Sequence, residues 1–167
     1  ERMKELGLFG STISPEYGGL GLPASIYAKI VTRLSSVWIV PGGIFNTHLV
    51  MAAAIERCGM EAQKQEWLPK MASGELRGGI ALTEPDAGTD LQSIRTRADR
   101  NEKGYLLNGT KMWITNALHG NCLMVLAKTD LTAQPAHKGM SAFLCHKGAG
   151  YDVAKKLKKM GYRAIDT

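Results

Sequence analysis

The stretch ALTEPDAGTDL, residues 81–91, concentrates residue types that bind polar ligands. Thr83 and Thr89 supply hydroxyl groups, and Gly88 permits a close approach of the backbone. At the rim of a sheet, a turn of this composition exposes amides and hydroxyls that donate hydrogen bonds to a polar cofactor. A stiff surface turn without a ligand has the same composition, so the stretch alone leaves both interpretations open.

The residues before Gly78 predict helices. Four apolar residues recur at helical spacing and would line one face of a helix, namely Ile26, Ile30, Val31 and Leu34. Segment 44–58 is rich in Ala, Met, Leu and Ile, and Gly59 is its expected stop, because glycine tolerates the left-handed cap conformation. We expect the next helix to start weakly capped at Met60 and to be interrupted at Pro69, which lacks an amide hydrogen.

Beyond Gly78 the sequence predicts strands. Residues 93–100 alternate apolar with polar side chains, and residues 105–116 are rich in strand formers around an Asn-Gly turn. Short apolar runs at 122–129 and 140–147 are typical of buried strands. A helical region is therefore followed by a sheet region.

The predicted fold class is α+β. An N-terminal α-helical domain over residues 1–78 is expected to precede an antiparallel β-sheet or barrel domain over residues 79–167. The first ten residues resemble the inside of an amphipathic helix, without an initiator methionine or signal region, so we expect a segment of a longer protein. The longest apolar runs fall short of the roughly 20 residues of a transmembrane helix, so we expect no membrane span.

The charge balance of +6 raises the question of a nucleic-acid partner. The positive charges are mostly dispersed, and the densest run, KKLKK at 155–159, lacks interleaved aromatic residues for base stacking. A solvated surface is therefore favoured over a nucleic-acid site. The same positive excess would serve an anionic ligand that carries phosphates.

The cysteines and histidines predict neither a disulfide framework nor a metal site. Three cysteines are widely spaced and odd in number, and the four histidines are equally scattered. No pair shows the spacing of zinc ligands. This composition favours a reducing compartment.

Four segments, in order, resemble the acyl-CoA dehydrogenase family. ALTEPDAGTDLQS resembles the family's signature segment, and GTKMWITNA resembles its second flavin-contacting segment. LGLFGSTISPEYGGLGL is similar to the entry region, and KGMSAFLCHKGAGYDVAKKLKKMGYRAIDT to the later sheet region up to the G-x-R-x-x-D-T element. The four matches cover essentially the whole chain and are far more specific together than any one alone.

The resemblance implies an FAD-dependent enzyme that removes a proton and a hydride from an acyl-CoA thioester, with the hydride passing to flavin N5. It implies an electron-transfer flavoprotein as acceptor, a homotetramer or homodimer, and a location in the bacterial cytoplasm or the mitochondrial matrix. The catalytic base is expected in a C-terminal helical domain outside this sequence, so no catalytic residue is assigned here. Glu84 is expected to orient the backbone of its loop instead of acting as that base.

The resemblance also implies a set of cofactor-binding residues: Ile80, Leu82, Thr83, Gly88, Thr89, Trp113, Ile114 and Thr115. Trp113 would pack against one face of the flavin ring. Thr115 is expected on the same side of the strand as Trp113 and would lie near N5. Thr83 would reach the pyrimidine side, and Thr89 would contact the pyrophosphate and the acyl-CoA substrate. Asp86 departs from the family pattern and would have to point away from an anionic ligand. Trp38 and Trp67 are expected in the core instead.

Two other interpretations stay open. An acyl-CoA oxidase or flavin monooxygenase on the same scaffold would let oxygen reach the reduced flavin. A non-enzymatic basic protein that binds nucleic acid would keep the fold without the chemistry.

Overall fold

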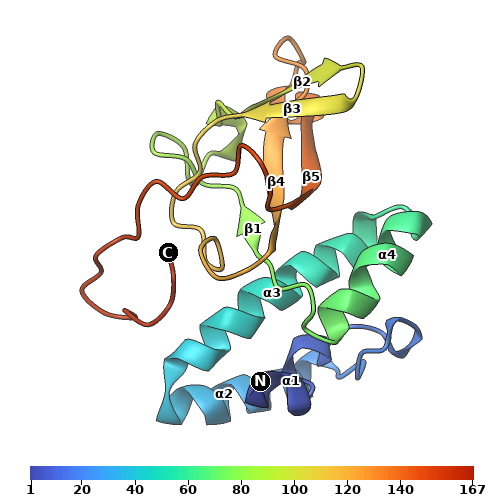
Figure 1. Ribbon diagram of the computed structural model, residues 1–167, viewed down its shortest axis with the longest axis vertical. Helices are drawn as coiled ribbons and strands as arrows, with labels where there is room; N and C mark the ends of the chain where they lie inside the picture. Colours follow the sequence, from blue (N-terminus) through green and yellow to red (C-terminus); the bar gives the residue numbers. More distant parts are fainter.

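The computed structural model describes residues 1–167 as a layer of helices that lies against one end of an open sheet (Figure 1). The helical layer consists of α1 (Arg2–Glu5), α2 (Ala24–Val37), α3 (Ile39–Cys58) and α4 (Glu61–Ala72), with short 3-10 turns at Leu8–Gly10 (η1) and Pro15–Tyr17 (η2). The sheet consists of β1 (Ile80–Ala81), β2 (Arg97–Asn101), β3 (Gly104–Asn108), β4 (Cys122–Lys128) and β5 (Met140–His146). Two further 3-10 turns, Leu91–Ser93 (η3) and Ala136–Gly139 (η4), precede β2 and β5. The α+β fold class is thereby confirmed.

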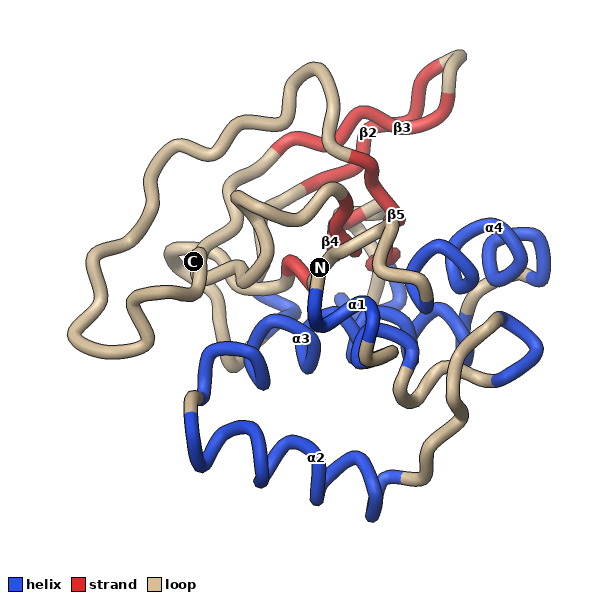
Figure 2. The backbone as a smooth tube through the Cα atoms, turned by 60° about the horizontal axis from the view of Figure 1, so that its bottom comes forward, coloured by secondary structure: helices blue, strands red, loops and turns tan.

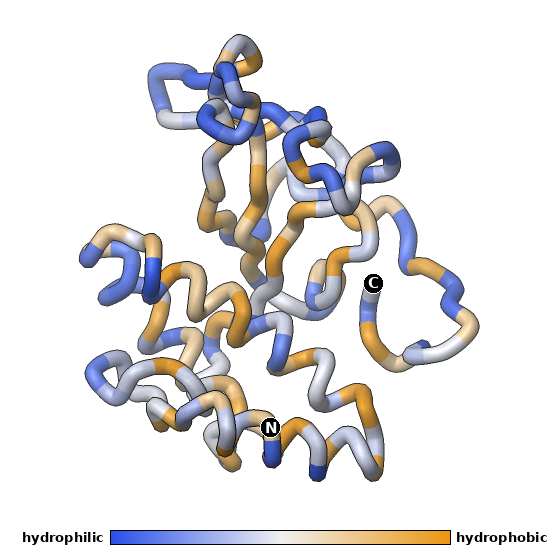
Figure 3. The backbone as a smooth tube through the Cα atoms, turned by 180° about the vertical axis from the view of Figure 1, so that it is seen from behind, coloured by the Kyte–Doolittle hydropathy of each residue, from blue (hydrophilic) through white to orange (hydrophobic).

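Helix α3 is the centre of the helical layer. It packs against α2 on one side and α4 on the other, and it meets η1 and β1 as well (Figure 2). Contrary to expectation, it is long and apolar enough to cross a membrane by length and composition. Eight of its residues are buried within the fold, as in the core helix of a globular domain. In Figure 3 the orange colour of hydrophobic residues is seen both along α3 and along the strands that begin beside it.

The expected face of α2 is largely confirmed, because Ile30, Val31 and Leu34 pack against the core, while Ile26 is exposed. The helix expected over the first ten residues is shorter than predicted, because α1 ends at Glu5. Helix α3 begins before the predicted start and includes Pro41, which lies in the first turn where its missing amide hydrogen has no helical partner.

The prediction that α3 stops at Gly59 is confirmed, but the expected left-handed cap and the expected interruption of α4 at Pro69 are wrong. Gly59 is extended (φ −71°, ψ 152°), not left-handed, and glycine is required there because a Cβ would lie 2.6 Å from the Ile55 carbonyl oxygen. Helix α4 continues through Pro69 to Ala72. Proline removes only one helical hydrogen bond, and the buried side chains of Leu68 and Met71 hold the helix in place on both sides of it.

The start of α4 has one of the two hydrogen bonds of a capping box. The Met60 side chain makes no capping hydrogen bond, as expected, but the Met60 amide donates to Gln63 Oε1 at 2.9 Å. This is the backward half of a capping box, and it satisfies one of the free amides at the helix start.

The sheet is open and mixed, so the expectation of a closed barrel or a purely antiparallel sheet is wrong. β2 with β3 and β4 with β5 are antiparallel, as predicted. β1 pairs with β4 in parallel, because both strands leave the helical layer in the same direction (Figure 1). β5 covers one edge of β4 along its length, so β1 and the first residue of β2 share the other edge.

The two tryptophans expected in the core differ. Trp67 on α4 is buried and stacks on His146 at the end of β5, with ring centroids 4.5 Å apart, so it joins the helices to the sheet. The prediction for Trp38 is wrong, because it is 57% exposed at the corner between α2 and α3.

His48 fastens α3 to the chain where it leaves the helical layer. Its side chain is fully buried, Nε2 lies 3.1 Å from the Met71 carbonyl oxygen, and the Gly78 amide donates to Nδ1 at 3.4 Å. A neutral ring with its hydrogen on Nε2 satisfies both partners. Burial lowers the pKa of His48 to about 4, so the ring stays neutral at physiological pH.

We expect the free energy of unfolding to fall as the pH is lowered from 7 to 5. The unfolded chain binds a proton at His48 near pH 6.5, whereas the folded chain does so only near pH 4. The loss should be about 2 kcal/mol by pH 5. Urea unfolding at each pH measures it, and the dependence should disappear in His48→Gln but persist in the exposed control His137→Gln. Equal slopes in all three proteins would contradict this assignment.

Candidate functional site

The structure brings the two predicted flavin-contacting segments together. The Met112 amide donates to the Thr83 carbonyl oxygen at 2.8 Å. Lys111 Nζ donates to the Leu82 carbonyl oxygen at 2.8 Å and to Glu84 Oε1 at 2.9 Å. The loop after β1 and the segment after β3 therefore form one unit, although almost thirty residues separate them in sequence.

Glu84 is the anchor of the loop after β1. It is 6% exposed, and its carboxylate accepts hydrogen bonds from the Arg95 amide at 2.6 Å and the Thr96 amide at 2.9 Å, besides Lys111. Burial acts to raise the pKa of Glu84, but hydrogen bonds from Thr96, the Arg95 amide and Lys111 lower it to about 2. The expectation that Glu84 orients loop backbone is confirmed.

The segment that carries Trp113 is not a strand, so that prediction is wrong beyond Asn108. Trp113 (φ 62°) and Asn116 (φ 67°) both adopt the left-handed conformation. This costs a residue such as tryptophan about 1–2 kcal/mol, whereas asparagine adopts it more readily. Strand alternation therefore does not relate Thr115 to Trp113. Between the two turns, Ile114 is buried against Ala81 and Leu123, while the Trp113 side chain is 55% exposed.

A second buried carboxylate holds the chain after this segment. Asp166 accepts hydrogen bonds from the amides of Asn116 at 3.2 Å, Leu118 at 2.8 Å and His119 at 2.8 Å. The Asn116 side-chain amide donates to the carbonyl oxygens of Ile44 at 3.1 Å and Gly78 at 2.8 Å. The turn is thus tied to both the C-terminal segment and the helical layer.

Sequence analysis missed Lys111, Asn116 and Asp166 as residues that shape the site. The Asn116 position carried a partial signal, because asparagine is among the few residues that adopt the left-handed conformation readily. Lys111 and Asp166 lie in segments that resemble the family, but nothing local indicates their partners, which lie far away in the sequence.

The predicted cofactor residues form an inner and an outer group. Ile80 in β1, Leu82, Thr83 and Thr115 are partly buried next to the bonded loop, whereas Gly88 and Thr89 are exposed at the rim. The Thr115 carbonyl oxygen lies close to residues 73–79, the linker between α4 and β1. A Cβ on Gly79 would approach this oxygen to 2.6 Å. Asp86 pairs with Arg95 at 3.3 Å on the exposed side of the loop.

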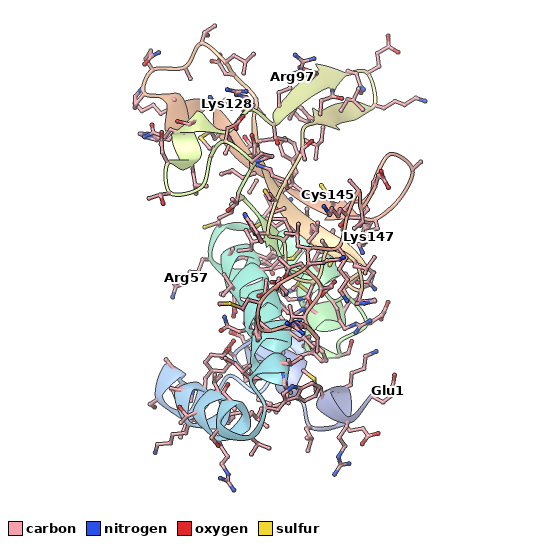
Figure 4. The ribbon with its side chains drawn as sticks, turned by 90° about the vertical axis from the view of Figure 1, so that its left-hand side faces the viewer. Glu1, Arg57, Arg97, Lys128, Cys145 and Lys147 are labelled. Carbon is pink, nitrogen blue, oxygen red and sulfur yellow. The ribbon has the colours of Figure 1, made fainter.

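The basic residues labelled in Figure 4 lie on different parts of the molecule. Arg97 and Lys128 lie at the end of the sheet far from the helices, whereas Lys147 lies near the junction and donates to the Leu118 carbonyl oxygen at 2.9 Å. The basic run 155–159 has no regular secondary structure, and Lys159 Nζ within it donates to the Ile165 carbonyl oxygen at 2.8 Å. The three cysteines are free, and no group of three potential metal ligands occurs.

Replacing Glu84 by Gln should destabilise the protein. The variant leaves Lys111 buried without its counter-charge and removes an acceptor from the loop, so we expect a loss of about 2–4 kcal/mol in the free energy of unfolding. Asp86→Asn is the matched control, because its ion pair with Arg95 is exposed and should change stability by less than about 0.5 kcal/mol. Chemical denaturation measures both, and equal effects would argue against the role given to Glu84.

A methyl group at Gly79 should disturb the contact between the linker and the Trp113 segment. The added Cβ would meet the Thr115 carbonyl oxygen at 2.6 Å and Thr47 Cγ2 at 3.0 Å, so we expect Gly79→Ala to cost about 1–3 kcal/mol. Gly88→Ala, whose Cβ would have only an ordinary contact at 3.7 Å, should be nearly neutral. Thermal unfolding of both variants tests the difference, and an unperturbed Gly79→Ala variant would refute the close approach.

Comparison with known proteins places this site in a family. The model of the acyl-CoA dehydrogenase N-terminal domain matches residues 1–75, and that of the acyl-CoA dehydrogenase middle domain matches residues 79–167. The mitochondrial isovaleryl-CoA dehydrogenase of Solanum tuberosum is 42% identical over 167 residues, which are 99% of this chain and 40% of that relative. The chain therefore spans about two fifths of the length of that relative.

Solved structures agree with the sequence comparison. The crystal structure of an acyl-CoA dehydrogenase from Geobacillus kaustophilus matches with a TM-score of 0.92 and 37% identity, over 99% of this chain and 44% of that one. The FAD complex of PigA matches with a TM-score of 0.88 and 29% identity, again over 99% and 44%. From the two family models, the relatives and the shared helical and sheet layers, we conclude that this chain belongs to the acyl-CoA dehydrogenase family.

Proposed function

We propose that this chain provides the flavin-binding wall of an FAD-dependent acyl-CoA dehydrogenase, which removes hydrogen from the α and β carbons of an acyl-CoA thioester. The observation that carries the proposal is Trp113, whose half-exposed indole lies on a left-handed turn next to Lys111 and Met112, which are hydrogen-bonded to the loop after β1. An exposed planar aromatic group in a fixed position fits a planar ring system such as the isoalloxazine. A neighbour in fold is named as an FAD complex, which supports the choice of cofactor.

The inner residues would contact the flavin ring. The carbonyl oxygens of Leu82 and Thr83 already accept hydrogen bonds from Lys111 and Met112, so the Thr83 hydroxyl, rather than these carbonyl groups, would contact the ring. The Ile114 side chain packs into the core, so its contact would come from the backbone, whereas Ile80 and Thr115 border the same region. At the exposed rim, Gly88 and Thr89 would contact the pyrophosphate, and Thr89 would also contact the acyl-CoA.

The chemistry divides between a cofactor and the protein. Bound FAD would supply the hydride acceptor. Trp113 would orient the ring and exclude water from one face, and Thr115 would place a hydroxyl beside it. None of these residues is proposed as the base, and Glu84 is unsuited to that role because its carboxylate already accepts three hydrogen bonds.

The proposal extends to the whole protein. It includes an electron-transfer flavoprotein as acceptor, assembly as a homotetramer or homodimer, and a place in the mitochondrial matrix or the bacterial cytoplasm. The mitochondrial name of the potato relative supports the first compartment. The proposal includes no nucleic-acid partner, since the densest basic run, 155–159, lacks interleaved aromatic residues for base stacking.

The visible spectrum of the purified full-length protein tests the function. Under anaerobic conditions, flavin absorption should bleach when isovaleryl-CoA, butyryl-CoA or palmitoyl-CoA is added, and the most effective thioester would define the substrate class. Peroxide formation in air would identify an oxidase instead. A colourless protein that also fails to bind added FAD would overturn the proposal.

Replacing Trp113 by Ala should weaken FAD binding about tenfold, because the flavin loses a stacked aromatic surface. Trp38→Ala is the matched control, since that side chain is similarly exposed but lies in the helical layer, at the junction of α2 and α3. Fluorescence titration of the flavin-free protein measures both dissociation constants. Equal constants in the two variants would argue against Trp113 as the wall.

A further inference from the structure

Two buried carboxylates flank the segment Trp113–Thr115. Glu84, through Lys111, holds the chain immediately before the segment, and Asp166 holds the turn immediately after it. Only Met112 separates the first anchored residue from Trp113, and Asn116 follows Thr115 directly. The conformation of the segment is therefore determined from both ends.

The second anchor comes from a distant part of the chain. Asp166 lies in the C-terminal segment, and its two oxygens accept hydrogen bonds from three amides of the turn that starts at Asn116. No strand pairing is available to those amides, so the carboxylate takes the place of a neighbouring strand. The turn also contains the left-handed Asn116, whose side-chain amide donates to the carbonyl oxygens of Ile44 and Gly78.

The C-terminal segment is itself fixed near Asp166. Lys159 Nζ donates to the Ile165 carbonyl oxygen at 2.8 Å and to the Thr167 hydroxyl oxygen at 2.9 Å. Ile165 is fully buried, and the Leu157 amide donates to the Thr167 carbonyl oxygen at 2.9 Å. Asp166 is thus held on both sides and has little freedom to follow a moving turn.

From this arrangement we infer that Asp166 is a positioning residue that presets the Trp113–Thr115 segment for its planar ligand. The inference rests on the proposed function for the identity of that ligand. Asp166 would not contact the ligand itself. It binds the backbone of the turn at Asn116, and this turn holds the residues that would contact the ring. A misplacement of about 1 Å in a positioning segment can lower a reaction rate about a hundredfold.

Asp166→Asn tests this role in the full-length protein. The substitution replaces one acceptor oxygen by a donor that faces the turn amides, whereas Asp152→Asn, an exposed position in the same segment, is the control. In the flavin-free protein, we expect the amides of Asn116, Leu118 and His119 to exchange hydrogen at least tenfold faster in Asp166→Asn. Amides of β4 and β5 should be unchanged, which separates positioning from general loss of structure.

FAD titration supplies the second readout. The dissociation constant should rise about 10- to 100-fold in Asp166→Asn and stay unchanged in the control. Unchanged exchange at the turn, or FAD affinity equal to wild type, would overturn the inference. If the wild-type protein binds no FAD, the proposed function fails, and the exchange measurement alone then decides on the positioning of the segment.

A second variant covers the case in which Asp166→Asn does not fold. Lys159→Met leaves Asp166 intact but removes the bonds that fix the segment around it. We expect faster exchange at the same three amides, with a smaller rise in the FAD dissociation constant. Exchange at those amides identical to wild type would overturn the inference.

Discussion

The structure depends on one constraint, which is that the irregular backbone at the junction of helices and sheet must find hydrogen-bond partners without strand pairing. Side chains meet it. Asn121 accepts from the Arg77 amide at 2.7 Å and donates to the Glu75 carbonyl oxygen at 2.8 Å, so it completes the linker between the layers. Glu84 and Asp166 do the same for the loop after β1 and the turn at Asn116. The position of Trp113 follows from these bonds and not from the sheet.

The carboxylates at the junction differ in kind from the ion pairs of the surface. Arg2 and Glu5 form an exposed pair, whose charges are screened by water and whose contribution to stability is small. Glu84 is buried and bonded to two amides and Lys111, so its removal would leave several unpaired polar groups. Among these charged residues, the larger contribution to stability is therefore expected from Glu84, next to the place where the candidate ligand would bind.

The sequence predicts those parts of the fold that are set locally. Helices α2 and α3 and strands β4 and β5 follow from periodicity and apolar runs, because each buries its own face. Local propensity predicts a break at Pro69, but the buried Leu68 and Met71 hold the helix through it. Trp38 is apolar yet exposed, because it lies at the junction of α2 and α3. The parallel pairing of β1 with β4 also needed the placement of the helices. For the site, the resemblance located both flavin-contacting segments and the G-x-R-x-x-D-T element that contains Asp166. It did not indicate which amides Asp166 binds, because they lie almost fifty residues away.

An exposed tryptophan on a strained turn needs an energetic reason. The left-handed backbone at Trp113 costs about 1–2 kcal/mol, and the indole remains half in water. Covering roughly 100 Å² of that indole with a planar ligand would return about 2–3 kcal/mol, which exceeds the strain. A mobile tryptophan would lose part of this gain, because its side chain would have to be ordered on binding. Trp38 is equally exposed without such strain or anchors, so exposure alone does not distinguish a ligand wall from a surface residue. The distinction lies in the buried carboxylates that hold the backbone on both sides of Trp113.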